Sequence, residues 1–254
     1  MRSRRLPGSS AGPIHMSDAP TTTTLALAVW PAPTKQPHRY LAAARGQHAI
    51  QPELAARAIL AYTDPGDLVI DPRCGIGTVL VEAIHNGRRA IGIEADRAAA
   101  ALATANISHA RAQGAPGRAA VLEGSPDRVG RLLAKATRLL GRSQNPRLRR
   151  HPAGSVQLLL TAAPAVPDER LLADWRAVIA PGGFLLFVHD QQAGVPGLGT
   201  IVAACERTGL EFWQHVVAVR RSPSESSALL HTDVLAFRKS ADKCGVRSER
   251  RVAA

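Results

Sequence analysis

Two carboxylates and a pair of glycines between residues 71 and 94 have the types and spacing of a ligand-binding loop. Asp71 ends a short apolar run, and Glu94 ends the next one. Gly75 and Gly77 follow directly after Asp71, and glycine lets the backbone pass close to a ligand because it has no Cβ and tolerates positive φ. A carboxylate at the end of the second strand of such a unit suits a pair of ribose hydroxyls. The pattern therefore predicts a nucleoside-binding loop.

The same loop excludes two common nucleotide sites. The G-x-G-x-x-G fingerprint of dinucleotide folds fails because Leu80 stands at the third glycine position. A dinucleotide site also places pyrophosphate at the helix N-terminus, where Asp71 would repel it. No G-x-x-x-x-G-K-[ST] segment occurs, so a phosphate-cradling P-loop is excluded as well. Asp71 suits a cationic or amino-bearing ligand instead.

Alternating strand and helix patterns predict the elements that position these groups. Helical patterns separate five apolar runs that have the length and composition of strands, at 68–71, 90–94, 120–123, 156–161 and 184–188. Such alternation predicts an α/β fold, a mostly parallel, doubly wound, Rossmann-like sheet. Two closing strands, about 211–219 and 233–237, follow one another without a helix. We therefore expect an antiparallel hairpin at the C-terminal end.

The strand–loop–helix pattern over residues 71–78, Asp-Pro-x-Cys-Gly-x-Gly-Thr, resembles the S-adenosylmethionine loop of class I methyltransferases. It is most similar to the branch that methylates exocyclic amino groups of nucleic acids, the DNA N-4/N-6 methylases and tRNA guanosine N-2 methylases. Further segments resemble the same branch: 29–30 with 38–40, 47–54 (with Ala49 where the family usually has proline), 181–188 and 231–239. The resemblance runs from about Trp30 to Lys239 and implies the seven-stranded methyltransferase sheet.

This resemblance implies S-adenosylmethionine as the cofactor and indicates which residues contact it. Nine residues match the family's cofactor positions: Asp71, Pro72, Cys74, Gly75, Gly77, Thr78, Glu94, Ala95 and Ser125. Ser125 stands where the family usually has an aspartate that accepts from the adenine amino group. A hydroxyl is a weaker acceptor than a carboxylate, and Asp127, two residues on, is a possible substitute.

The segment that should hold the methyl acceptor is degraded. Amino methylases carry [DNS]-P-P-[YFW] at the end of the fourth strand, where a polar side chain and a backbone carbonyl accept from the target amino group and an aromatic ring stacks on the flipped base. Here Thr161 is followed by Ala162-Ala163-Pro164-Ala165. Alanine neither accepts a hydrogen bond nor stacks. Thr161 and Pro164 are the candidates for what remains of catalysis, with nearby backbone carbonyls as acceptors.

The charge balance favours a polyanionic partner. The chain has 32 Lys and Arg against 20 Asp and Glu, a net charge of +12. No acidic residue occurs between Arg128 and Arg150, and a helical pattern there predicts a core-packing helix with a basic outer face. A merely solvated surface is the alternative. We expect a nucleic acid, DNA or tRNA, as the partner.

Composition also sets the expected organisation. We expect a disordered tail over residues 1–24, a methyltransferase domain over 25–240 and a basic tail over 241–254. The three cysteines include no CxxC pair, and the histidines show no metal-ligand spacing. The sequence has no twenty-residue apolar run and no secretory signal. These features predict a cytoplasmic protein without a metal or a membrane span.

Three functions remain open from the sequence. The first is an S-adenosylmethionine-dependent methyltransferase acting on an exocyclic amino group of a nucleic-acid base. The second is a catalytically impaired relative that binds nucleic acid or a partner protein, and the third is a small-molecule methyltransferase. The intact loop favours cofactor binding in all three, the alanines at 162, 163 and 165 count against the first, and the basic helix counts against the third. The extent of the resemblance places the first ahead.

Overall fold

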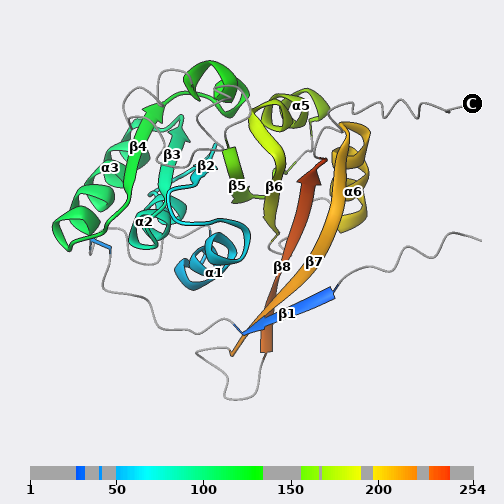
Figure 1. Cartoon of the computed structure of the whole chain (residues 1–254), viewed down its shortest axis with the longest axis horizontal. Helices are drawn as coiled ribbons and strands as arrows, with labels where there is room; N and C mark the ends of the chain where they lie inside the picture. The colour runs from blue at the N-terminus through cyan, green and yellow to red at the C-terminus, as the bar shows by residue number, and fades with distance from the viewer. Residues whose placement is uncertain are drawn as a thin grey trace, which may run out of the picture.

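One eight-stranded sheet forms the centre of the molecule, as a computed structural model shows (Figure 1). The structure describes residues 27–31, 40–41, 50–133, 156–165, 168–189, 197–221 and 229–240. The strands are β1 (Leu27–Pro31), β2 (Leu68–Asp71), β3 (Arg89–Glu94), β4 (Arg118–Glu123), β5 (Val156–Ala162), β6 (Ile179–His189), β7 (Leu210–Arg221) and β8 (Leu229–Lys239). Their order across the sheet is β1-β7-β8-β6-β5-β2-β3-β4, and only β8 runs antiparallel to its neighbours.

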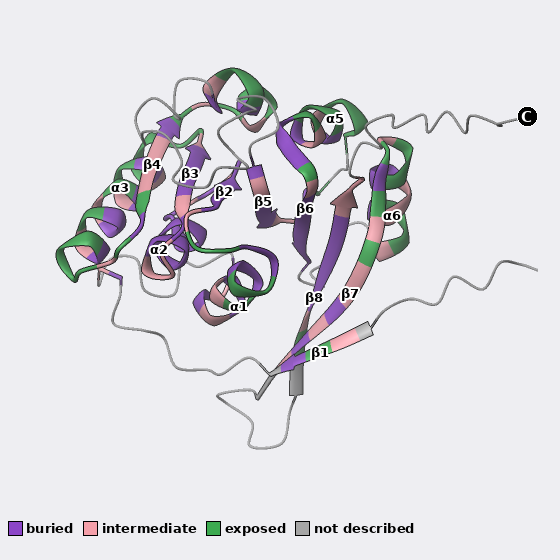
Figure 2. Cartoon of the chain, viewed as in Figure 1, coloured by how far each residue is buried: buried purple, intermediate pink, exposed green. Residues whose placement is uncertain are grey.

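Helices cover both faces of this sheet. They are α1 (Pro52–Tyr62), α2 (Thr78–His85), α3 (Arg97–Ala112), α5 (Glu169–Val178) and α6 (Leu198–Arg207), with a short 3-10 helix η2 (Pro126–Arg128). One apolar core joins α1, α2 and α3 to the first face, and a second joins α5 and α6 to the other. Figure 2 shows that the central strands between them are buried. Strand β2 is buried along its whole length, as expected of a parallel strand covered on both sides.

The chain reverses direction across the sheet between β2 and β5. After β2 it adds β3 and β4 on one side, and then it returns to place β5 on the other side of β2. Open α/β sheets bind ligands at such a switch point, beyond the carboxyl ends of the strands. Asp71 at the end of β2 and Ala162 at the end of β5 flank this point.

The predicted architecture is confirmed, with two differences. The seven expected strands and the C-terminal hairpin are present, but β1 adds an eighth strand that pairs parallel with β7. Strand β6 begins at Ile179 rather than at Phe184, because Ile179 already pairs with Val156 of β5 before a register shift. A side chain at Gly183 would approach the carbonyl oxygens of β5 to about 3 Å, so the chain passes close to its neighbour there.

Aspartate side chains cap the N-termini of two helices. Asp96 accepts from Ala99 N at 2.7 Å, and Asp168 accepts from Arg170 N at 2.8 Å, so each caps the helix behind it. The two tails, 1–24 and 241–254, and most of the basic segment after Leu133 lie outside the described residues. Within the described part of the chain, no helix is long and apolar enough to cross a membrane.

Candidate cofactor and acceptor site

Asp71 is a buried carboxylate at the carboxyl end of β2. Its side chain is 4% exposed, and its Oδ1 accepts from Arg73 N at 3.1 Å. Burial raises the pKa of Asp71 to about 6, although the Arg73 N–H and the Thr161 hydroxyl act to lower it. A cationic ligand beside this carboxylate would favour the charged form. The buried carboxylate of Asp71 therefore suits a positively charged ligand rather than a phosphate.

The loop after Asp71 depends on glycine in two ways. Gly75 has φ +50° and open space where a Cβ would be, whereas Gly77 has φ +83° and a Cβ there would lie 3.0 Å from the Cβ of Ala103. Positive φ strains other residues. The absence of a side chain at Gly77 thus allows the start of α2 to pack closely against α3. The space beside Gly75 is open, so a ligand could approach the backbone there.

Cys74 packs the loop onto β3 and is not placed as a nucleophile. A Cβ at Gly92 of β3 would lie 2.6 Å from Cys74 Sγ, so the thiol fills the space that a larger residue at 92 would need. Burial raises the pKa of the Cys74 thiol well above its usual range. A buried neutral thiol is inert, so Cys74 contributes to the loop by packing.

Glu94, at the end of β3, accepts hydrogen bonds from three backbone N–H groups around the loop. Its Oε2 accepts from Gly75 N at 2.8 Å, and its Oε1 accepts from Ala95 N at 2.9 Å and Asp96 N at 3.0 Å. The carboxylate is half-buried and faces the glycine turn. The predicted cofactor residues Asp71, Gly75, Glu94 and Ala95 are therefore brought together at the tips of two adjacent strands.

Ser125 lies at the tip of β4, next to this group. Gly124 N donates to Glu94 O at 2.9 Å, and Trp175 Nε1 donates to Pro126 O at 2.9 Å, so the turn is fixed to β3 and to α5. The Ser125 hydroxyl holds the pKa of the exposed Asp127 below its usual range. The structure thus places both candidate adenine contacts at one turn, and their role stays a prediction.

Buried polar side chains behind the loop were not found from the sequence. Asn106 of α3 is fully buried; its Nδ2 donates to Ile76 O at 2.9 Å, and its Oδ1 accepts from Leu41 N at 3.1 Å. Tyr40 Oη donates to Glu82 Oε1 at 2.8 Å. These contacts fasten residues 40–41, part of the resembling lead-in, to the loop and to α2. The position of Asn106 among the apolar residues of the α3 pattern was a signal in the sequence for such a buried contact. The neighbouring segment with His48 lies outside the described residues.

Pro72 and Thr78 complete the predicted cofactor set. Pro72 is buried directly after Asp71, and Thr78, 4% exposed, begins α2. The first N–H groups of a helix lack intrahelical partners. These residues therefore shape the two ends of the loop.

The acceptor segment continues the tip of β5. Thr161 is fully buried, Pro164 is buried and Ala165 is exposed. Ala163 N donates to Val188 O at 2.8 Å, which extends the pairing of β5 with β6. Thr161 and Pro164 thus lie at the expected edge of the sheet, and the residues at 162–165 themselves offer no side-chain acceptor and no aromatic ring.

Arg73 is the functional candidate that the sequence prediction missed. Its Nη2 donates to the carbonyl oxygen of Ala162 and so spans from the loop to the tip of β5. Burial lowers the pKa of this guanidinium, while Asp71 and Glu94 raise it. A cation directly behind Asp71, in a loop matched to a cationic ligand, was a signal in the sequence that could have drawn attention to it.

A small cavity of about 30 Å³ lies between the loop and β5. Its lining residues come from both halves of the site and are Ile50, Asp71, Arg73, Cys74, Gly75, Ile76, Thr78, Val79 and Ala162. This cavity therefore adjoins both the loop and the tip of β5.

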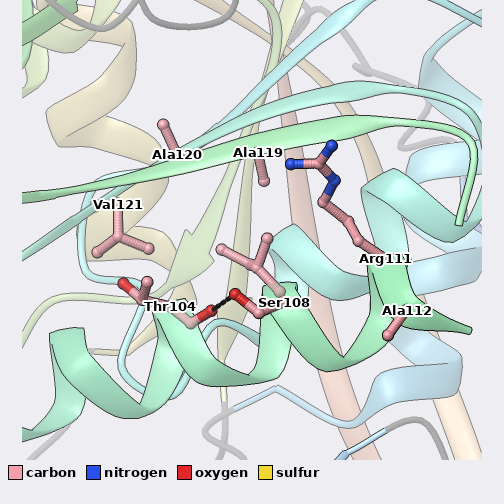
Figure 3. A pocket seen from close by; sticks show the side chains of 8 residues that line it. Thr104, Ser108, Arg111, Ala112, Ala119, Ala120 and Val121 are labelled. Atoms are coloured by element: carbon pink, nitrogen blue, oxygen red, sulfur yellow. Dashed lines mark hydrogen bonds between the residues drawn. The ribbon is translucent and has the colours of Figure 1, made fainter.

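A larger hollow of about 480 Å³ lies between α3 and the edge strand β4 (Figure 3). Figure 3 shows Arg111 extending from α3 toward Ala119. The hydroxyls of Thr104 and Ser108 donate to carbonyls of their own helix, at 2.9 Å and 3.0 Å. None of the predicted cofactor residues lines this hollow, so the cavity at β2 and β5 is the better candidate site.

The cofactor half of the chain matches a known family. Residues 19–105 match the family model described as DNA methylase. This match includes the loop, β2 and β3, and it ends before the acceptor segment at 161–165. No curated protein matches the chain in sequence.

Solved structures share the fold at low identity. A TehB-like S-adenosylmethionine-dependent methyltransferase from Corynebacterium glutamicum is 17% identical, with a TM-score of 0.50 over 78% of this chain and 92% of that one. A methyltransferase from Methanosarcina mazei is 16% identical, with a TM-score of 0.50 over 73% and 98%. A protein assigned as an RNA methyltransferase from Pyrococcus horikoshii is 14% identical, with a TM-score of 0.50 over 76% and 83%.

The fold of this chain is similar to that of S-adenosylmethionine-dependent methyltransferases, and its segment 19–105 is similar to the DNA methylase family. S-adenosylmethionine is the cofactor that the family implies, and when bound it supplies an electrophilic methyl group. The residues of this chain fit that cofactor: Asp71 matches a positive ligand, Glu94 offers oxygens to hydroxyl donors, and Gly75 leaves room for close approach.

Proposed function

We propose that this methyltransferase transfers a methyl group from S-adenosylmethionine to an acceptor held between the tips of β2 and β5. The observation that carries the proposal is the paired carboxylates: Asp71 is buried at the end of β2, and Glu94 binds the glycine loop from the end of β3. Asp71 lines a cavity that Ala162 of β5 also lines, and Gly75, the residue that Glu94 binds, lines it too. The donor and acceptor halves therefore adjoin.

The first candidate acceptor is the exocyclic amino group of a nucleic-acid base, in DNA or tRNA. The match to the DNA methylase family and the net charge of +12 support it. In this function Thr161 and Pro164 would shape the acceptor site, and a backbone carbonyl at the tip of β5 would accept from the amino group.

A second candidate acceptor is a small molecule. The observation that favours it is the acceptor segment itself, where Ala162, Ala163 and Ala165 offer neither a side-chain acceptor nor an aromatic ring. Stacking on an aromatic side chain contributes about 1–3 kcal/mol per base. Without it, an extruded base loses a large part of the binding energy that would hold it.

Calorimetric titration with S-adenosylmethionine, followed by transfer assays with methyl-labelled cofactor, tests the proposal. We expect micromolar binding and label in one of three fractions: DNA, tRNA or small molecules. Label in either nucleic acid supports the first acceptor, and label in the small-molecule fraction supports the second. Binding without transfer would favour an impaired relative that binds nucleic acid or a partner protein, whereas no binding would contradict the proposed function.

A further inference from the structure

Arg73 occupies one of the backbone acceptors at the β5 tip. An amino methylase needs an oxygen at this tip to accept from the target amine, and alanine at 162 removes the side-chain acceptor of that position. The Arg73 Nη2 already donates to the Ala162 carbonyl. A target amine would have to compete with a charge-assisted hydrogen bond, which is roughly twice as strong as a neutral one.

The remaining donors of Arg73 change the polarity of the site. A guanidinium has five N–H donors and no acceptor. Its Nε is buried and has no hydrogen-bond partner among the described residues, and the side chain lines the cavity beside Ala162. Apart from Asp71, the side chains that line this cavity bring no carboxylate. The acceptor side therefore presents donors and positive charge.

Electrostatics indicates which acceptor such a site takes. Arg73 keeps its charge at neutral pH, and the cofactor that Asp71 and Glu94 would hold is also cationic at sulfur. Asp71 and Glu94 offset part of this positive charge, and an anionic acceptor, unlike a neutral amine, would be attracted to both Arg73 and the sulfonium. A carboxylate also matches the planar fork of a guanidinium.

We propose that Arg73 makes the acceptor subsite specific for a carboxylate, so that the reaction forms a methyl ester rather than an N-methyl amine. This inference rests on the proposed methyl transfer at this site and concerns only its acceptor. In the step, a carboxylate lone pair forms the new O–CH3 bond as the S–CH3 bond breaks and its electrons return to sulfur. An anion and a sulfonium become a neutral ester and a neutral thioether, and no proton is released.

The absence of proton release agrees with the composition of the cavity. Methylation of an amine or an alcohol must also dispose of a proton, for which a positioned base is the usual means. Asp71 is the carboxylate among the cavity-lining residues, and it already accepts from Arg73 N and lies on the donor side. A carboxylate acceptor needs no base.

Linked binding tests this inference without any turnover. The affinity for S-adenosylmethionine is measured by calorimetry in sodium formate and in sodium chloride at equal ionic strength, formate being the smallest carboxylate. We expect formate to raise the affinity by about tenfold, within the usual range of coupling between two sites. The Arg73→Met variant should bind the cofactor but lose the formate effect, and Arg73→Lys should restore part of it.

The outcomes separate this inference from the proposed function. Binding of the cofactor with no difference between formate and chloride overturns the carboxylate subsite and leaves the proposed methyl transfer intact. An equal formate effect in Arg73→Met also overturns it. No cofactor binding in either salt overturns both.

The chemistry of the product gives a second, independent test. Methyl-labelled cofactor is incubated with the protein and with separate small-acid, protein and nucleic-acid fractions, and mild alkali is then applied. Methyl esters release volatile labelled methanol under alkali, whereas N-methyl groups retain the label. We expect alkali-labile label, in the small-acid fraction if the carboxylate is free and in the protein fraction if it is a side chain or chain end. Alkali-stable label in nucleic acid overturns the inference.

Discussion

The tips of β2 and β3 differ sharply from the tip of β5. At the first two, every polar group that the family pattern requires is present, and Glu94 and Asp71 bind the loop through backbone N–H groups. At β5 the pattern has lost its side-chain acceptor and its aromatic ring, and Arg73 donates to the carbonyl of Ala162. The two halves of one site therefore differ in how much of the family pattern they retain. In the proposed function, the loop would bind the donor, and a few residues at one strand end would determine the acceptor.

The largest expected effect is on the donor half. We expect Asp71→Asn to weaken S-adenosylmethionine binding by about a hundredfold or more, since removing a buried charged partner costs about 3–5 kcal/mol. Asn retains an oxygen for Arg73 N, so the melting temperature at neutral pH should not fall. Calorimetry and thermal unfolding measure the two effects. Asp174→Asn, on an exposed position of α5, is the matched control and should change neither. Unchanged affinity in Asp71→Asn would show that the loop carboxylate is only structural.

The second prediction joins the two halves. Restoring Ser-Pro-Pro-Tyr at 162–165 should create little methylation of DNA or tRNA while Arg73 still holds the carbonyl at 162. Combined with Arg73→Met, the same segment should raise amine methylation by about 5- to 150-fold over Arg73→Met alone, the range that corresponds to a stacking gain of about 1–3 kcal/mol. Labelled-cofactor transfer to nucleic acid measures it. Additive effects of the two changes would mean that Arg73 does not obstruct the acceptor.

The third prediction uses the raised pKa of Asp71. Burial raises this pKa from 3.8 to about 6, so the folded protein keeps the proton over a range where the unfolded chain has lost it. The stabilising contribution of that proton is complete below 3.8 and is lost as the pH rises through about 6. Because a cationic ligand prefers the carboxylate, cofactor affinity should rise by up to about tenfold per pH unit below 6 and level off above it. A pH series of calorimetric titrations measures this. A cofactor affinity that does not change with pH would show that Asp71 does not interact with the cofactor.

The smallest expected effect concerns the support behind the loop. Tyr40→Phe removes the hydroxyl that donates to Glu82, which is 1% exposed. We expect a loss of about 1–3 kcal/mol in the free energy of unfolding, the usual cost of leaving a buried acceptor without this donor. Cofactor affinity should change little, because Tyr40 does not itself line the cavity. Denaturant unfolding gives the free energy of unfolding. A loss in the free energy of cofactor binding that exceeds the loss in the free energy of unfolding would show that Tyr40 contributes to cofactor binding.

Much of this comparison was available from the sequence, because the donor half relies on local patterns. Asp71, the glycines and Glu94 follow directly from strand ends and turn residues, and their meeting at one sheet edge follows from parallel topology. The loss at 162–165 was likewise visible residue by residue. The Arg73 contact was not, because residues 73 and 162 are 89 positions apart and only the sheet order brings them together. Strand β1 was missed for a similar reason, since its partner β7 lies at the other end of the chain.

That same β1 has a consequence for how the protein behaves in solution. Residues 27–31 pair with 215–219 of β7, so they cover a row of backbone groups that would otherwise template association with another chain. The opposite edge strand, β4, is guarded differently: it begins at the exposed Arg118 and ends at the exposed Glu123. One edge is shielded by the chain's own N-terminal region and the other by charge. Shortening the protein past Pro31 should therefore promote self-association through β7, even in molecules whose cofactor loop is complete.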